Sequence, residues 1–108
     1  MVEDESAIRR LIVVVLRDLG LETISAPDAE TALGMLETAS PDLIITDVRL
    51  PGMDGVEFTR RVKSDGERKT PVLLTSAYGE PRGHEGDGFL PKPFDVDTLA
   101  EAVSAFVH

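Results

Sequence analysis

The sequence predicts an α/β fold in which helices cover both faces of a parallel β-sheet. Leu43-Ile44-Ile45 is a short, continuous apolar run after a Pro-Asp turn, which is typical of a strand buried on both faces. Similar short apolar runs alternate with helix-like stretches along the chain. The length of 108 residues suits one domain with a single core. We therefore expect residues 1–108 to form a single doubly wound domain with five strands.

The chain begins with what resembles the last part of an apolar strand. Met1-Val2 runs directly into the acidic residues Glu3-Asp4-Glu5, so the first strand is expected to be truncated. Ser6 is the expected N-cap of a helix over 6–19, in which apolar residues recur at helical spacing. Gly20 is the expected stop of this helix.

The other elements are delimited by proline, glycine and aspartate residues. The remaining strands are expected at 21–26, 43–47, 72–76 and 88–90, with a loop at 67–71. The remaining helices are expected to open at Pro27-Asp28, to run from Gly55 to Ser64-Asp65-Gly66, and to begin near Asp95 or Asp97. Strands and helices thus alternate in βα units.

One crossover is too short and too rich in glycine to repeat this pattern. Residues 77–87, between the last two expected strands, include three glycines and a proline. Each glycine costs a helix about 1 kcal/mol relative to alanine, and a proline costs about 3 kcal/mol. We expect a short or absent fourth helix, and we expect His84 within it to be a solvated loop residue and not a metal ligand.

The composition excludes several classes of protein and site. The chain has no cysteine, which rules out disulfides and thiolate metal sites. Its longest apolar run, 11–16, is far shorter than the roughly 20 residues that cross a bilayer. Twenty acidic and eleven basic residues give a formal charge of −9, which opposes binding to nucleic-acid phosphates. We expect a soluble, cytoplasmic protein that contacts neither membranes nor nucleic acid directly.

Reactive side chains follow four of the five expected strands. These are Glu3 and Asp4, Asp47, Ser76 and Lys92, in chain order. In open α/β sheets, ligands bind beyond the carboxyl ends of the strands, so we expect these residues to lie close together. Neighbouring carboxylates repel one another, and a hard divalent cation such as Mg²⁺ would relieve that repulsion.

Four motifs resemble those of the receiver, or CheY-like, domain of two-component response regulators. They are Val2-Glu3-Asp4-Glu5, Asp47 with Leu50-Pro51-Gly52-Met53-Asp54-Gly55, Pro71-Val72-Leu73-Leu74-Thr75-Ser76-Ala77, and Lys92-Pro93-Phe94. The resemblance spans nearly the whole chain and implies a flavodoxin-like sheet of order 2-1-3-4-5, here with a truncated first strand. The shortened crossover resembles a subset of receivers with a degenerate fourth helix, which is associated with HWE-type kinases.

The resemblance implies that Asp47 is the phosphoacceptor. Its carboxylate would attack a phosphohistidine on a sensor histidine kinase or phosphotransfer protein. Glu3 and Asp4 match the acidic pair that holds Mg²⁺, with Asp47 and the backbone carbonyl of Arg49 as further ligands. Asp54, in the turn after Asp47, is expected to cap the next helix and not to bind metal.

The remaining roles concern the phosphoryl group and the switch that it controls. Lys92 and Ser76 match the residues that contact phosphoryl oxygens, and Phe89 matches the aromatic position that moves with the hydroxyl. The bond before Pro93 would be cis. The chain would then be a phosphorelay signalling domain that catalyses only its own phosphorylation and dephosphorylation, and that binds a downstream protein or forms a homodimer.

Two other functions stay open at this point. The chain could keep the receiver fold as a constitutive protein-interaction module without phosphotransfer, for instance if Glu3 and Asp4 are not held in place. It could also be a Mg²⁺-dependent phosphatase with a nucleophilic aspartate, although no substrate pocket or second acid/base aspartate near Asp47 is recognisable.

Overall fold

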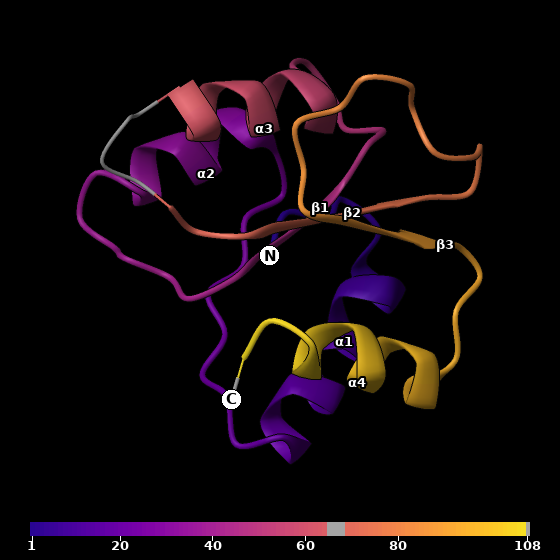
Figure 1. Cartoon of the computed structure of the whole chain (residues 1–108). Coiled ribbons are helices and arrows are strands. Elements are labelled where there is room, and N and C mark those ends of the chain that lie inside the picture. Colours follow the sequence, from indigo (N-terminus) through magenta and orange to yellow (C-terminus); the bar gives the residue numbers. More distant parts are fainter. Residues whose placement is uncertain (65–68, 108) are drawn as a thin grey trace.

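A parallel sheet lies between two layers of helices in the computed structural model, which describes residues 1–64 and 69–107 (Figure 1). Within these residues the sheet has three strands in the order β1-β2-β3. They are β1 (Ile44–Asp47), β2 (Val72–Ser76) and β3 (Gly88–Pro91). The helices are α1 (Ser6–Asp18), α2 (Ala29–Met35), α3 (Gly55–Ser64) and α4 (Val96–Ser104). Their order along the chain is α1-α2-β1-α3-β2-β3-α4, so the predicted alternation holds from α2 to β2. No strand separates α1 from α2, and no helix separates β2 from β3.

The strands are parallel and buried where helices cover both faces. Every residue of β1 and β2 is buried, which explains why both strands begin with consecutive apolar residues. Their buried polar residues lie at the carboxyl ends. The register pairs Asp47 with Thr75 and Ser76 with Pro91. The carboxyl ends of all three strands therefore lie at the same edge of the sheet.

The prediction of five strands was wrong in the described part of the chain, where two of the five are reduced to single bridges. Val2 bridges in parallel to Ala26 on one side and to Thr46 on the other. Among the described residues, the bridge of segment 21–26 is at Ala26, and the Ile24 carbonyl also accepts a hydrogen bond from the Met1 α-amino group at 3.0 Å. The predicted truncation of the first strand is correct, and counting the bridges as strands reproduces the implied order 2-1-3-4-5.

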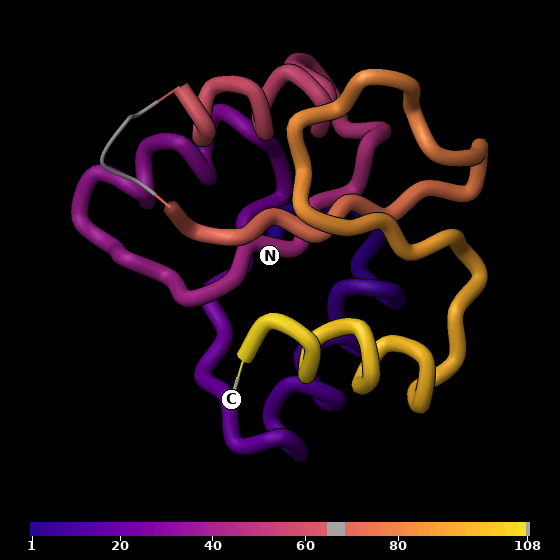
Figure 2. Tube along the Cα trace, in the orientation of Figure 1, coloured from indigo at the N-terminus to yellow at the C-terminus, as the bar shows by residue number. Residues whose placement is uncertain are grey.

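Two hydrophobic clusters hold the helices onto the sheet. One lies under α2 and α3 and is centred on Phe58, which is fully buried. The other lies under α1 and α4 and contains Ile12, Leu73 and Leu99. Figures 1 and 2 show these two helix pairs on opposite sides of the sheet. None of the described helices is both long and apolar enough to cross a membrane.

Aspartate side chains cap two helices. Asp28 accepts a hydrogen bond from the Thr31 N–H at 2.7 Å and caps α2, as the sequence predicts. Asp95 accepts one from the Thr98 N–H at 2.7 Å and caps α4, which decides between the two predicted starts.

The prediction that Ser6 caps α1 was wrong. Glu5 occupies the N-cap position without a side-chain cap, and Ser6 is already helical. The shift has a local cause, because the Glu5 N–H is held by the carboxylate of Glu3 at 3.1 Å. The predicted end of the third helix at Asp65-Gly66, and the first residues of the predicted loop 67–71, lie outside the described residues.

The crossover 77–87 contains no helix, as predicted. The expectation of a solvated His84 was wrong, because its side chain is only 10% exposed. Its Nδ1 accepts a hydrogen bond from the Gly86 N–H at 3.1 Å, so its Nε2 carries the proton that faces Glu80 Oε2 at 2.7 Å. The His84 ring thus bonds to two residues of the crossover, Gly86 and Glu80, whereas glycines have no side chain that could form such bonds.

Candidate functional site

Side chains from four segments converge at the carboxyl edge of the sheet. Asp47 ends β1, Ser76 ends β2, and Lys92 directly follows β3. The bridge from Val2 to Thr46 brings Glu3 and Asp4 to the same edge. The fold thus collects residues that are up to 89 positions apart in sequence.

Lys92 lies at the centre of this cluster. Its Nζ donates hydrogen bonds to Glu3 Oε1 at 2.8 Å and to Asp47 Oδ2 at 3.0 Å. The side chains of Lys92, Glu3 and Asp47 are 9%, 1% and 7% exposed, so these are buried ion pairs. Charges removed from water in this way are tolerated because each has an opposite partner.

Burial and pairing change the acid–base properties of the cluster. Burial raises the pKa of Glu3 above its ordinary value of 4.5, although hydrogen bonds from Lys92 and from the Glu5 amide oppose the rise. Burial alone would lower the pKa of Lys92, but hydrogen bonds to Glu3 and Asp47 raise it above 10.5. Lys92 therefore remains an ammonium ion at neutral pH and places a fixed positive charge beside Asp47.

The backbone of Asp47 is held from several sides. Its N–H donates to the Val2 carbonyl at 2.9 Å, and its own carbonyl accepts a hydrogen bond from Thr46 Oγ1 at 3.0 Å. A Cβ at position 55 would lie 2.1 Å from the Asp47 carbonyl oxygen, so only glycine lets α3 begin here. Asp54 caps α3 by accepting from the Glu57 N–H at 2.8 Å, as the sequence predicts. From the sequence, Gly55 is predicted only as a turn residue, and its close approach to the Asp47 carbonyl is not predicted.

Three carboxylates of the cluster form a donor set that fits a magnesium ion. Glu3, Asp4 and Asp47 each offer an oxygen, and these atoms lie within 4.8 Å of one another. Glu3 and Asp47 are buried, whereas Asp4 is exposed. Mg²⁺ prefers such hard oxygen ligands and usually keeps several waters, which the exposed side at Asp4 allows. The carbonyl of Arg49 stays a predicted ligand.

Ser76 and an unpredicted aromatic residue lie beside the cluster. The Lys92 N–H donates to the Ser76 carbonyl at 2.9 Å, and the Tyr78 N–H donates to Ser76 Oγ at 3.0 Å. The guanidinium of Arg49 lies 4.1 Å from the centre of the Tyr78 ring, in a cation–π contact. The sequence reasoning missed this contact, and its only signal was the chain's single tyrosine beside the end of β2.

The other two predicted features are found as follows. Phe89 lies on β3 in register with Leu74 and is half-buried, and its role as a switch stays a prediction. The Lys92–Pro93 peptide bond is cis, as the resemblance implied.

Sequence comparison identifies relatives over the whole chain. The model of the response regulator receiver domain matches residues 1–104. The chemotaxis protein CheY of Pseudomonas aeruginosa is 37% identical over 111 residues, which cover 95% of this chain and 90% of that protein. The phosphate regulon regulatory protein PhoB of Escherichia coli is 35% identical over 115 residues, which cover all of this chain and 50% of PhoB. The chain thus spans half the length of the PhoB relative.

Solved structures show the same architecture. The chemotaxis response regulator CheY4 of Vibrio cholerae superposes with a TM-score of 0.90 at 31% identity, over 98% of this chain and 94% of that one. The receiver domain of a signal transduction histidine kinase from Syntrophus aciditrophicus gives 0.91 at 29% identity, over 98% and 86%. These matches do not separate subsets of receivers, so the likeness to those of HWE-type kinases stays a prediction.

Proposed function

Because the chain belongs to the response regulator receiver domain family of two-component systems, we propose that Asp47 accepts a phosphoryl group from a phosphohistidine. The donor would be a sensor histidine kinase or a phosphotransfer protein. A carboxylate oxygen of Asp47 attacks phosphorus, the new O–P bond forms as the N–P bond breaks, and the electron pair returns to the imidazole. The observation that carries this proposal is the buried contact of 3.0 Å between Lys92 Nζ and Asp47 Oδ2.

Lys92 supports the reaction by its charge and position. Because Nζ holds Oδ2, the carboxylate is oriented and its other oxygen is left to attack. The ammonium is already in place where negative charge develops on the phosphoryl oxygens, so it need not be reorganised during the reaction. Glu3, Asp4 and Asp47, with the Arg49 carbonyl, would hold Mg²⁺, which when bound would offset the negative charge of the phosphoryl group and of the carboxylates.

The response to phosphorylation begins at Ser76. The phosphoryl group brings nearly two negative charges and strong hydrogen-bond acceptors. The Ser76 hydroxyl, which now accepts from the Tyr78 N–H, would turn to donate to a phosphoryl oxygen. Phe89 and the crossover 77–87 would follow it, which shifts the population of two conformations. A downstream protein, or a second copy of the chain, would bind the favoured conformation.

The test is intact-mass spectrometry after incubation with acetyl phosphate and Mg²⁺. The wild-type chain should gain one phosphoryl mass, and Asp47→Asn should gain none. Asp54→Asn is the matched control, because it changes an aspartate of the same turn that only caps α3. A wild-type chain that is folded but gains no mass would contradict the proposal and favour a constitutive interaction module. Multiple turnover on phosphoesters would favour a phosphatase instead.

A further inference from the structure

The turn between β1 and α3 carries Arg49, whose carbonyl is a predicted Mg²⁺ ligand. Backbone hydrogen bonds fix both ends of this turn. The Val48 N–H donates to the Thr75 carbonyl at 2.9 Å, and the Gly55 N–H donates to the Val48 carbonyl at 2.8 Å. Between these ends, residues 49–53 form no backbone–backbone hydrogen bond within the described part of the chain. The middle of the turn therefore depends on side chains for its position.

A side chain of α2 reaches the middle of this turn. Glu30, in the first turn of α2, accepts a hydrogen bond through Oε1 from the Met53 N–H at 3.0 Å. A Cβ at position 52 would lie 3.0 Å from the same oxygen, so the carboxylate lies directly against the Gly52 backbone. Gly52 has a φ of 76°, which only glycine adopts without strain. Among the described residues, the bond to Glu30 is the only hydrogen bond that residues 49–53 make.

Packing against a shared core brings the two segments together. Ala29 and Ala32 of α2 are buried in the cluster under α2 and α3. Leu50 and Met53 of the turn are partly buried against the same cluster. The first turn of α2 therefore lies beside the turn after β1, within reach of the Glu30 side chain.

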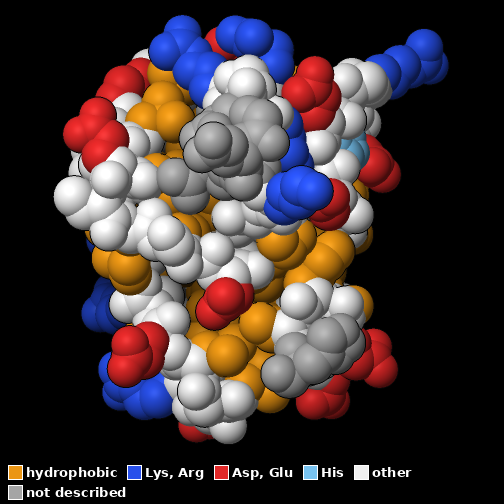
Figure 3. Space-filling model, turned by 60° about the vertical axis from the view of Figure 1, so that its left-hand side comes forward, with side chains coloured by type: hydrophobic (Ala, Val, Ile, Leu, Met, Phe, Trp, Pro, Cys, Tyr) orange, Lys and Arg blue, Asp and Glu red, His pale blue; other side chains and the backbone are white. Residues whose placement is uncertain are grey.

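Charge alone does not distinguish Glu30 from the other acidic residues of the chain. Figure 3 shows acidic side chains at several separate places on one face of the molecule. Glu30 is not one of the three carboxylates that lie within 4.8 Å of one another at the metal site. An acidic residue in the first turn of a helix also interacts favourably with the helix dipole, but that effect needs no bond to another segment. What distinguishes Glu30 is its bond to a backbone group 23 positions away.

The geometry points to a positioning residue: we propose that Glu30 holds residues 49–53 in the conformation in which the Arg49 carbonyl can bind Mg²⁺. The inference rests on the proposed Mg²⁺-dependent phosphorylation of Asp47. A hydrogen bond from a backbone N–H to a carboxylate is charge-assisted and stronger than one between neutral groups. Removing a residue that holds a metal ligand in place typically weakens metal binding by about 10–100-fold. Glu30 acts through Met53 and not on Arg49 directly, so we expect the low end of this range.

The test is an NMR titration of the ¹⁵N-labelled chain with MgCl₂ in the absence of a phosphodonor. In the wild type, amide signals at and beside Asp47 should shift as Mg²⁺ binds. Glu30→Ala should weaken Mg²⁺ binding about tenfold. It should also speed hydrogen exchange at the Met53 amide, because that N–H loses its acceptor. The matched control is Glu37→Ala, which removes an exposed carboxylate beyond the other end of α2 and should bind Mg²⁺ like the wild type.

Two conservative variants separate the hydrogen bond of Glu30 from its charge. Glu30→Gln keeps an acceptor oxygen at the same reach and loses the charge, so Mg²⁺ affinity should stay within about threefold of the wild type. Glu30→Asp keeps the charge but is one methylene shorter, so it should weaken Mg²⁺ binding as much as Glu30→Ala does. The spectrum of each free variant shows whether it is folded, and these two variants decide the question if Glu30→Ala does not fold.

Three results would overturn this role of Glu30. They are a wild-type Mg²⁺ affinity in Glu30→Asp, a loss in Glu30→Gln equal to that in Glu30→Ala, and no Mg²⁺-dependent shift in the wild type. A failure of phosphotransfer is a separate result, because it is read from the mass of the chain, whereas Mg²⁺ binding and exchange at Met53 are read without a phosphodonor. With acetyl phosphate, Glu30→Ala should need more Mg²⁺ for its half-maximal rate but reach the wild-type rate at saturation.

Discussion

Removing the Lys92 ammonium should destabilise the chain strongly. At an effective dielectric constant of about 20, each of its contacts with Glu3 and Asp47 corresponds to a gross attraction of roughly 5–6 kcal/mol. Desolvation of the three groups and repulsion between the two carboxylates offset much of this attraction. Losing one partner of a buried ion pair typically costs about 3–5 kcal/mol, because the other charge is left buried and unpaired. We expect Lys92→Met to lower the free energy of unfolding by this amount at neutral pH.

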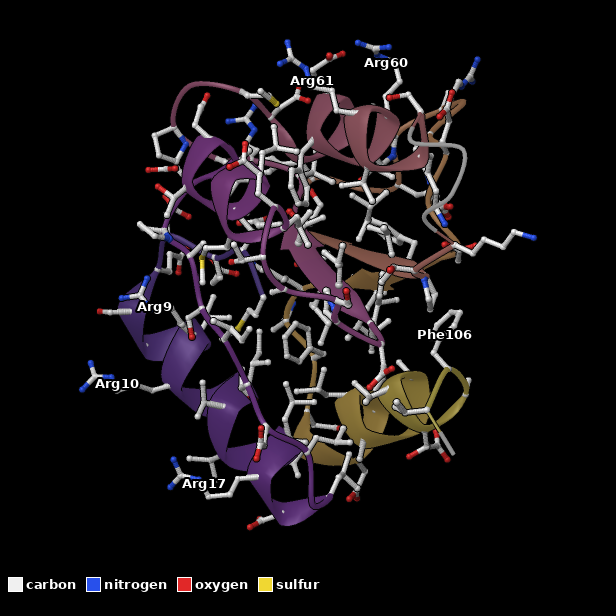
Figure 4. All side chains as sticks on the ribbon, turned by 90° about the vertical axis from the view of Figure 1, so that its left-hand side faces the viewer. Arg9, Arg10, Arg17, Arg60, Arg61 and Phe106 are labelled. Carbon is white, nitrogen blue, oxygen red and sulfur yellow. The ribbon has the colours of Figure 1, made fainter. Side chains whose placement is uncertain are left out.

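Urea unfolding followed by circular dichroism measures this change, provided that the slope with denaturant is the same in both chains. The matched control is Arg61→Met, which removes a cation from a pair with Glu57 at 2.9 Å. Arg61 is 52% exposed and points away from the molecule (Figure 4). Its loss should leave the midpoint unchanged, because exposed pairs contribute little.

The pH dependence separates lost charge from lost packing. Burial already raises the pKa of Glu3, and removing Lys92 would raise it further. An acid whose pKa is higher in the folded chain destabilises that chain when ionised, so the deficit of Lys92→Met should shrink as the pH falls toward 4.5, the ordinary value for Glu3. Adding Glu3→Gln should also recover stability. A deficit below about 1 kcal/mol at pH 7, or one that does not change with pH, would refute buried pairing as its cause.

Three further predictions concern the supports of the site and the crossover. Gly55→Ala should destabilise the chain by about 3 kcal/mol in urea unfolding, whereas Gly34→Ala, with open space around it, should stabilise α2 by roughly 0.5–1 kcal/mol. Partial burial would raise the pKa of Asp87, but hydrogen bonds, mainly the one from Lys63, lower it below the ordinary value of 3.8. In urea unfolding, the free energy of unfolding of the wild type should therefore exceed that of Asp87→Asn by about 1 kcal/mol above pH 3.8. This difference should disappear as the pH falls below 3.8. His84→Ala should speed hydrogen exchange across 77–87 and cost about 1–2 kcal/mol, measured by exchange and urea unfolding; unchanged exchange would contradict its structural role.

The parts of the fold that local patterns determine could be predicted from the sequence. β1 and β2 begin with apolar runs because helices cover both of their faces, and Asp28 caps α2 through a contact three residues away. Pairing in a sheet depends on a distant partner. Segment 21–26 has the composition of a strand, yet in the described part of the chain its bridge is the single one from Ala26 to Val2.

The same distinction applies to the site. Residue types at strand ends predict which side chains gather, because the fold brings those ends to one edge. They do not predict which atoms pair, since the contact of Lys92 with Glu3 joins residues 89 positions apart. Nor does a sequence reveal that Gly55 lies against the Asp47 carbonyl, or that the His84 side chain is only 10% exposed in a glycine-rich loop. These features exist only once separate segments are packed together.

The acidic cluster is held unequally by the chain around it. Asp47 belongs to a strand that is paired along its length with β2 and bridged to Val2 on its other side. Glu3 follows a single bridged residue, and its N–H donates to the Ala26 carbonyl at 3.2 Å. Its carboxylate accepts hydrogen bonds from Lys92 Nζ and the Glu5 N–H, and its carbonyl accepts one from the Arg9 side chain at 2.8 Å. Lys92 therefore both supplies charge beside Asp47 and fixes the N-terminal segment to the end of β3. If Lys92 turns toward a phosphoryl group on Asp47, its hold on Glu3 weakens, and the first residues of the chain become part of the response to phosphorylation.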